Sequence, residues 1–160
     1  MTKKDFIELM HKVQNPLKGM IKMIPEEKVD WRPAPGFMSV GQVLKHVSEN
    51  WVFLKMMITG QFPKGDIEEE MKLENLKSST PNEAFEACEM DFNSCVAFIE
   101  KEISEEDFFN KVIEAPWGFK GAIWQAVTML RDHQTNHKMQ LHLYMKMLGL
   151  PVHTGTLYGM

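Results

Sequence analysis

Cysteine is scarce in this chain of 160 residues, and long apolar runs are missing from it. The two cysteines, Cys88 and Cys95, are seven residues apart in a helical pattern, so their Cα atoms would lie roughly 10 Å apart. That separation excludes a disulfide between them, and we interpret both as reduced core thiols. No apolar stretch approaches the ~18–20 residues of a membrane span. The charged N-terminus also lacks the apolar centre of a secretory signal, so a cytoplasmic location is expected.

Basic clusters are lacking as well. Lysine and arginine number 18 against 22 acidic residues, for a net charge of −4, and no long basic run occurs. Neither nucleic acid nor a membrane is therefore an expected partner. The length predicts one domain over residues 1–160, large enough to bury a core without disulfides. The fourteen methionines are interpreted either as adaptable core residues or as the lining of a plastic pocket.

Apolar residues recur at helical spacing over four segments, and start or stop signals bound most of them. Pro16 lies inside the first segment and predicts a kink, or a split at Asn15. Ser39 and Gln42 fit a capping box at the start of the second. The tail from Pro151 onward is expected to be loop. The predicted helices cover residues 4–24, 40–59, 81–102 and 121–148.

Four amphipathic helices without a convincing sheet predict an all-α fold, a four-helix bundle. A helical turn is expected within residues 67–76, and a short strand or extended segment within residues 111–115. The connections between the helices are each well over ten residues, which is long for a simple up-down bundle. Connections of this length predict loops that shape a site at one end.

Histidine is the residue type that points to chemistry. His133 and His137 are four residues apart on the last predicted helix, so they project from one face and could reach one cation. Zinc proteases use the same spacing as H-E-x-x-H, but here the residues between are Gln-Thr-Asn and the glutamate is missing. This difference argues against protease chemistry and not against a metal. Taken alone, the pair also fits solvated or hydrogen-bonded histidines.

A third ligand is needed, because catalytic zinc sites typically combine three protein ligands with one open position. His46 is the best candidate, since it lies mid-helix among Leu44, Val47 and Trp51 and is expected to point into the bundle. A hydrogen-bonded core histidine is the alternative interpretation. Three imidazoles from two helices would cap one face of a divalent ion.

Two amides flank these histidines. Asn50, one turn after the second-helix histidine, is a candidate to orient a ligand or water. Gln140, about one turn beyond the H-x3-H pair, could support the site from behind. Each also fits a solvated amide. His142 is expected at the surface or an interface, and His153 in the tail could contact the site or a substrate.

The order and spacing of these features resemble the DinB / YfiT-like superfamily of metal-dependent enzymes over nearly the whole chain. WRPAPGFMSVGQVLKHVSENW resembles that family's entry into its second helix, and DHQTNHKMQLHLYMKMLGLPV resembles its last helix. The PWG before the last helix and the ending TLYGM fit as well. The resemblance implies a four-helix bundle that holds a divalent metal, often nickel or zinc, through His46, His133 and His137.

Family members with known activity resemble thiol-dependent transferases and isomerases that use low-molecular-weight thiols. The leading hypothesis is therefore a metal-dependent thiol S-transferase acting on a small molecule, in which the metal lowers the pKa of the thiol. Metal-assisted hydrolysis is the first alternative, but it needs a proton acceptor, and Glu49 is the nearest carboxylate in sequence to His46. A non-catalytic bundle that binds a metal, ligand or partner is the second. Whether the chain is an enzyme stays open.

A homodimer is one interpretation of the last helix, which carries apolar residues on more than one side. Burial of those residues in the core is the other interpretation. The residues concerned are Trp124, Met129, Met145 and Met147.

Overall fold

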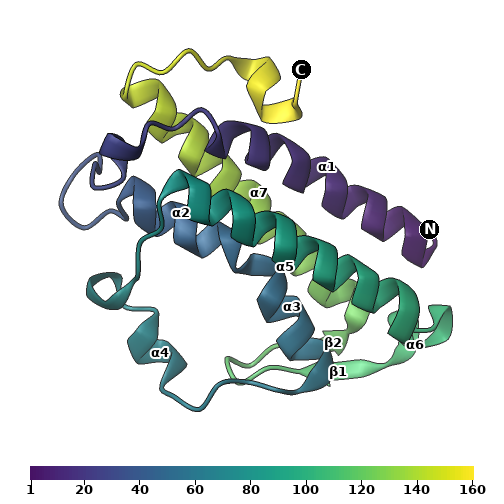
Figure 1. Cartoon of the computed structure of the whole chain (residues 1–160). Coiled ribbons are helices and arrows are strands. Elements are labelled where there is room, and N and C mark those ends of the chain that lie inside the picture. The colour runs from purple at the N-terminus through teal and green to yellow at the C-terminus, as the bar shows by residue number, and fades with distance from the viewer.

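The computed structural model is a bundle of four long helical elements with a two-stranded hairpin at one end (Figure 1). It describes residues 1–66 and 68–160 in full and residue 67 by its backbone alone. Among the described residues, no helix is both long and apolar enough to cross a membrane. The long elements are α1 (Lys3–Ile21), α2 (Val40–Ser48) followed by α3 (Asn50–Thr59), α5 (Pro81–Glu102) and α7 (Ile123–Met147). The short ones are α4 (Ile67–Glu70), α6 (Glu105–Asn110), β1 (Val112–Glu114), β2 (Lys120–Ala122) and 3-10 turns at Glu26–Lys28, Leu73–Asn75 and Thr154–Tyr158.

Each long element packs against two others. Helix α1 contacts α5 and α7, and the α2–α3 pair contacts the same two helices from the opposite side. Helices α1 and α7 run in one direction, and α2, α3 and α5 run in the other (Figure 1). Because α3 and α5 are parallel, the chain must return along the bundle between them, which explains the long connection that carries α4.

The predicted start signals are present. Ser39 accepts a hydrogen bond from the Gln42 backbone N–H at 3.2 Å, and the Gln42 side chain accepts one from the Ser39 N–H at 2.8 Å. The Gln42 amide also donates to the carbonyls of Leu73 and Leu76, both at 3.1 Å, which ties the α3–α5 connection to the start of α2. Caps of this kind contribute about 1 kcal/mol each and fix where the helix begins.

The core runs the length of the bundle. Trp51 is fully buried and its ring packs edge-on against Phe92 of α5, with ring centroids 5.7 Å apart. Cys88 and Cys95 are buried free thiols, in agreement with the sequence interpretation. Burial raises the pKa of Cys88 to about 11 and that of Cys95 to about 12, so both thiols are protonated at neutral pH.

The predicted helix over residues 40–59 is wrong in one respect, because it is interrupted at Glu49. This residue has φ −93° and ψ −4°, and it separates α2 from α3. Ser48 donates its hydroxyl to the Lys45 carbonyl at 2.8 Å, a local bond of the type that bends helices. The Val52 N–H then bonds back to the Glu49 carbonyl at 3.1 Å, in a tighter turn than an α-helix.

Three smaller predictions also need correction. Pro16 does not split α1, which runs unbroken, with Val13 and Leu17 buried on either side of the proline; the alternative, a kink at Pro16, stays a prediction. Helix α7 begins two residues later than expected, because β2 pairs antiparallel with β1 and places Gly121 opposite Ile113. The tail is not all loop, since residues 154–158 form a 3-10 turn.

Candidate metal centre

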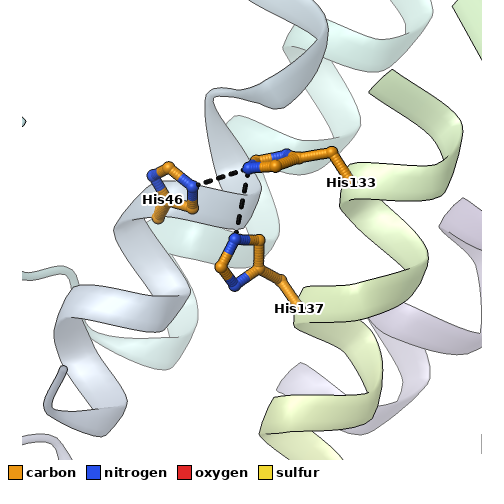
Figure 2. A group of neighbouring side chains, drawn as sticks. All are labelled: His46, His133 and His137. Carbon is orange, nitrogen blue, oxygen red and sulfur yellow. Dashed lines mark hydrogen bonds between the residues drawn. The ribbon is translucent and has the colours of Figure 1, made fainter. Parts of the chain in front are cut away.

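The three histidines singled out from the sequence lie together between α2 and α7 (Figure 2). His46 comes from α2, and His133 and His137 come from successive turns of α7. The Nε2 atom of His133 is 3.1 Å from that of His46 and 3.2 Å from that of His137. One ligand atom from each ring lies within 4.8 Å of the other two. All three rings are partly exposed, so the convergence point is accessible.

Local structure explains why these rings meet. The capping box at Ser39 fixes the start of α2, and Val43 and Val47 are fully buried on the face that packs into the bundle. His46 is adjacent to that face and sits at its edge, where α2 contacts α7. On α7, the four-residue spacing places the other two rings one above the other.

Asn50 fixes the orientation and the tautomer of His133. Its amide nitrogen donates to the Leu130 carbonyl at 3.2 Å, so its oxygen must be the atom that faces His133 Nδ1, at 2.9 Å. An amide oxygen only accepts hydrogen bonds, and Nδ1 therefore carries the proton. The lone pair of His133 is then on Nε2, directed at the convergence point.

Gln140 does the same for His137. The amide oxygen of Gln140 lies 2.7 Å from His137 Nδ1, and its nitrogen donates to the Tyr144 hydroxyl at 3.0 Å. This arrangement leaves the Nε2 lone pair of His137 free. Metal-ligating histidines usually donate their other ring nitrogen to an acceptor in this way.

Burial keeps the imidazoles of His46 and His133 neutral. Burial, and then the charges of the two neighbouring imidazoles, lowers the pKa of His46 to about 4. Burial and His137 lower the pKa of His133 to about 4 as well. Since metal ligands must be deprotonated, both residues are in the binding form at neutral pH.

The geometry of the three histidines suits a metal ion. With Nδ1 protonated on both α7 histidines, no proton remains for the 3.2 Å contact between His133 Nε2 and His137 Nε2, and two lone pairs face each other. A cation relieves that repulsion. Two nitrogens bound to one tetrahedral zinc at ~2.0–2.1 Å would lie about 3.3–3.4 Å apart, close to the distances seen here.

An apolar pocket of about 370 Å³ adjoins the histidines. The side chains that form it come from α2, α3, α4 and the residue after it, the turn of the β1–β2 hairpin and α7, so the long connections do shape one end of the site, as expected. The lining residues are His46, Asn50, Phe53, Glu68, Met71, Trp117, Met129, Leu130 and His133.

The two amides predicted as cofactor-binding residues, Asn50 and Gln140, both bond to histidine rings in this structure. Direct contact of either with a cofactor stays a prediction. Glu49, the carboxylate considered as a base, instead pairs with Lys45 at 2.8 Å on the surface.

The other histidines do not join the cluster. His142 was expected at the surface or an interface. It is instead buried, with 3 % of its surface exposed, and its Nε2 lies 3.2 Å from the His153 carbonyl. His153 accepts from the Gly155 N–H through Nδ1 and so caps the final turn. His11 packs edge-on against Phe92, with ring centroids 4.8 Å apart.

Sequence reasoning missed most of the pocket wall. Phe53, Glu68 and Met71 precede α5, and Trp117 lies in the hairpin turn, so no single spacing pattern joins them. The Pro-Trp-Gly turn and the long connections were the only signals available. The contact of Tyr144 with Gln140 was also missed, because a buried tyrosine on a helix is usually interpreted as a core residue.

Similar folds are known among bacterial proteins. A DinB-like protein from Bacillus cereus ATCC 10987 aligns with a TM-score of 0.77 at 17% identity, covering 95% of this chain and 96% of that one. A DinB-like protein from Bacillus subtilis aligns with a TM-score of 0.68 at 18% identity, over 92% and 96% of the two chains. A protein described as a DinB-family member from Exiguobacterium sibiricum 255-15 gives 0.71 at 17% identity, over 96% of each chain. At these identities the likeness shows the fold alone.

Sequence comparison identifies the family. No curated protein matches the chain. The model of the DinB family, however, matches residues 1–158, which include all three clustered histidines and both helices that carry them. The chain therefore belongs to the DinB family.

Proposed function

We propose that His46, His133 and His137 bind one divalent ion, zinc or nickel, and that the protein is a metal-dependent thiol S-transferase acting on a small molecule. The observation that supports the metal is the convergence of the three Nε2 atoms, two of them with lone pairs set by amide partners. Imidazole suits zinc and nickel alike, so both ions belong to the proposal.

The chemistry of the surroundings favours transfer to a thiol. A bound divalent ion would lower the pKa of a low-molecular-weight thiol and keep it as the thiolate. Three protein ligands leave a coordination position open, and the adjoining pocket can hold an apolar second reactant away from water. No side chain would have to act as a base, because the thiol proton would pass to solvent before the sulfur bonds to the electrophilic carbon, and the leaving group would depart from that carbon with the bonding electron pair.

Hydrolysis needs more from the chain than transfer does. An attacking water benefits from a nearby carboxylate that takes its proton. Glu49 is engaged by Lys45, and Asp132 bonds to Arg131 at 2.7 Å. Glu68 of the adjoining pocket is the carboxylate that hydrolysis would require, whereas transfer to a thiol needs no base, so we favour transfer.

The first test is metal content. Protein purified without a histidine tag is compared with a His133→Ala/His137→Ala double variant and with a His11→Ala/His153→Ala control, whose histidines lie outside the cluster. We expect about one zinc or nickel per chain in wild type and control, and none in the first variant. Absence of metal from wild type after incubation with both ions would refute the metal site and the transferase with it.

The second test separates transfer from passive binding. The metal-loaded protein is assayed with a panel of low-molecular-weight thiols and neutral electrophiles, and loss of free thiol is followed. We expect the double variant to fall to the uncatalysed rate. A loaded wild type that accelerates none of these reactions would leave a non-catalytic metal-binding bundle as the function.

A further inference from the structure

The pocket beside the histidines is more specific than a general solvent cleft. Its volume of about 370 Å³ lies in the range of pockets that hold small organic molecules, ~300–1,000 Å³. Five of its nine lining residues are apolar. Asn50 adds little polarity, because it is 2 % exposed and both ends of its amide are bonded to His133 and to the Leu130 carbonyl.

Aromatic side chains pack against one another in the wall of the pocket. Trp117 lies edge-on to Phe53, with centroids 6.0 Å apart and planes at 76°, and edge-on to Phe62 at 5.6 Å and 84°. The indole is still 42 % exposed, so part of it remains free to contact a ligand. Met71 and Met129 supply two thioethers to the same pocket, and thioether sulfur makes favourable contacts with aromatic rings.

The charges of the lining residues also affect which ligands the pocket favours. Glu68 is the acidic residue among the described lining residues, and neither lysine nor arginine is found among them. An anionic ligand would therefore meet a carboxylate without a compensating cation on the apolar side. The polar contacts that the lining offers to a neutral ligand include His46 and His133.

We propose that this pocket binds an uncharged aromatic compound, with its ring held by Phe53, Trp117 and Met129 and its polar substituent directed toward His46 and His133. The assignment of this compound as the electrophile rests on the proposed function, whereas its binding does not. Trp117 and Met129 are then the residues that determine specificity.

A second hollow of about 870 Å³ lies between α1 and the C-terminal turn and is lined by residues that include His11, Lys12 and His153. None of its described polar lining residues is buried, and none of the clustered histidines is among them. It therefore offers a ligand no buried polar anchor, whereas the smaller pocket adjoins the histidines.

Binding is tested directly and without turnover. Ligand-observed NMR and calorimetry are used to compare benzyl alcohol with cyclohexylmethanol, which has a similar shape without the π-system, and with benzoate, which adds a negative charge. Metal-free protein is used first and zinc-loaded protein second. We expect benzyl alcohol to bind more tightly than either comparison compound to the metal-free protein.

Variants locate the binding. Met129→Trp should fill the pocket and weaken benzyl alcohol binding by about tenfold or more, whereas Trp117→Ala should weaken it by about 2- to 10-fold, the range measured for aromatic pairs. Trp117→Phe should retain most of the affinity. Phe37→Ala is the control, since Phe37 is 51 % exposed and outside the pocket lining.

The outcomes separate the two proposals. No binding of benzyl alcohol to wild type, or equal binding by wild type, Met129→Trp and Trp117→Ala, would overturn the aromatic pocket even if zinc binds normally. Zinc titration of the same samples should give unchanged stoichiometry in every variant. Failure of wild type to bind either zinc or nickel would refute the proposed function and would leave the ring-binding result to decide the pocket by itself.

Discussion

Replacement of Asn50 by alanine should weaken metal binding although Asn50 need not touch the metal. The variant removes the oxygen that accepts from His133 Nδ1, so neither the ring orientation nor the tautomer is fixed any longer. Loss of such a partner typically reduces metal affinity about 10- to 100-fold, or about 1.4–2.7 kcal/mol. The Leu130 carbonyl also loses the second of its donors while it keeps its bond within α7, and loss of one hydrogen bond costs about 0.5–1.5 kcal/mol of folding free energy.

Asn50→Asp separates these two effects. A carboxylate still accepts from His133 Nδ1, so zinc affinity should stay near the wild-type value. It cannot donate to the Leu130 carbonyl, so the free energy of unfolding should fall as much as in Asn50→Ala or further. Asn136→Ala is the matched control, because Asn136 is exposed on α7 between the two ligands.

The assay is a competition titration of zinc against a chromophoric chelator, paired with urea unfolding in the presence of a strong chelator. The first measurement reports affinity and the second reports stability of the metal-free fold. If Asn50→Ala binds zinc as tightly as Asn136→Ala does, the amide does not orient the ring, and the tautomer argument for the site is refuted.

Two further predictions follow from burial. The free energy of unfolding of the metal-free protein should be level between about pH 6.5 and 8 and should fall between pH 6.5 and about 4, because the unfolded chain protonates His46 and His133 there while the folded chain, with pKa values of about 4, does not. Urea titrations at several pH values measure this slope, and the His46→Ala/His133→Ala variant should flatten it. Cys88 and Cys95 should not react with a thiol reagent until the protein unfolds, since their raised pKa values and burial suppress the thiolate. A fast reaction of either thiol in native buffer would contradict the packing described here.

The long helices were predictable because their signals are local. A cap residue and an apolar period of 3.6 residues can both be recognised within a single segment of the sequence. Thr80-Pro81, for example, predicted the start of α5 at the observed residue. The spacing of His133 and His137 is equally local. Even the choice of His46 needed only the expectation that bundles build sites between facing helices.

The features that could not be predicted depend on contacts between segments that are distant in the sequence. The interruption at Glu49 arises from the hydrogen bond of the Ser48 hydroxyl to the Lys45 carbonyl and from one tighter turn. No proline or glycine at this position indicates it in the sequence. The pocket wall combines side chains from α2, α3, α4 and the residue after it, the hairpin turn and α7, and the order of these segments in the sequence does not indicate that they lie close together. The homodimer stays a prediction, since Met145 is buried whereas Met147 is 62 % exposed on the same helix.

A buried polar network explains why ligands from two helices meet in register. Gln134, fully buried between the two α7 ligands, donates to the Val47 carbonyl of α2 at 3.0 Å and to the Gln14 side chain of α1 at 3.2 Å. The Trp51 indole N–H donates to the same Gln14 oxygen at 2.9 Å. A slide of α7 by one turn would break these bonds at a cost of about 1–3 kcal/mol for each group left unpaired. Since His133 adjoins Gln134, the bonds that set helix register in the core also hold the ligands opposite His46.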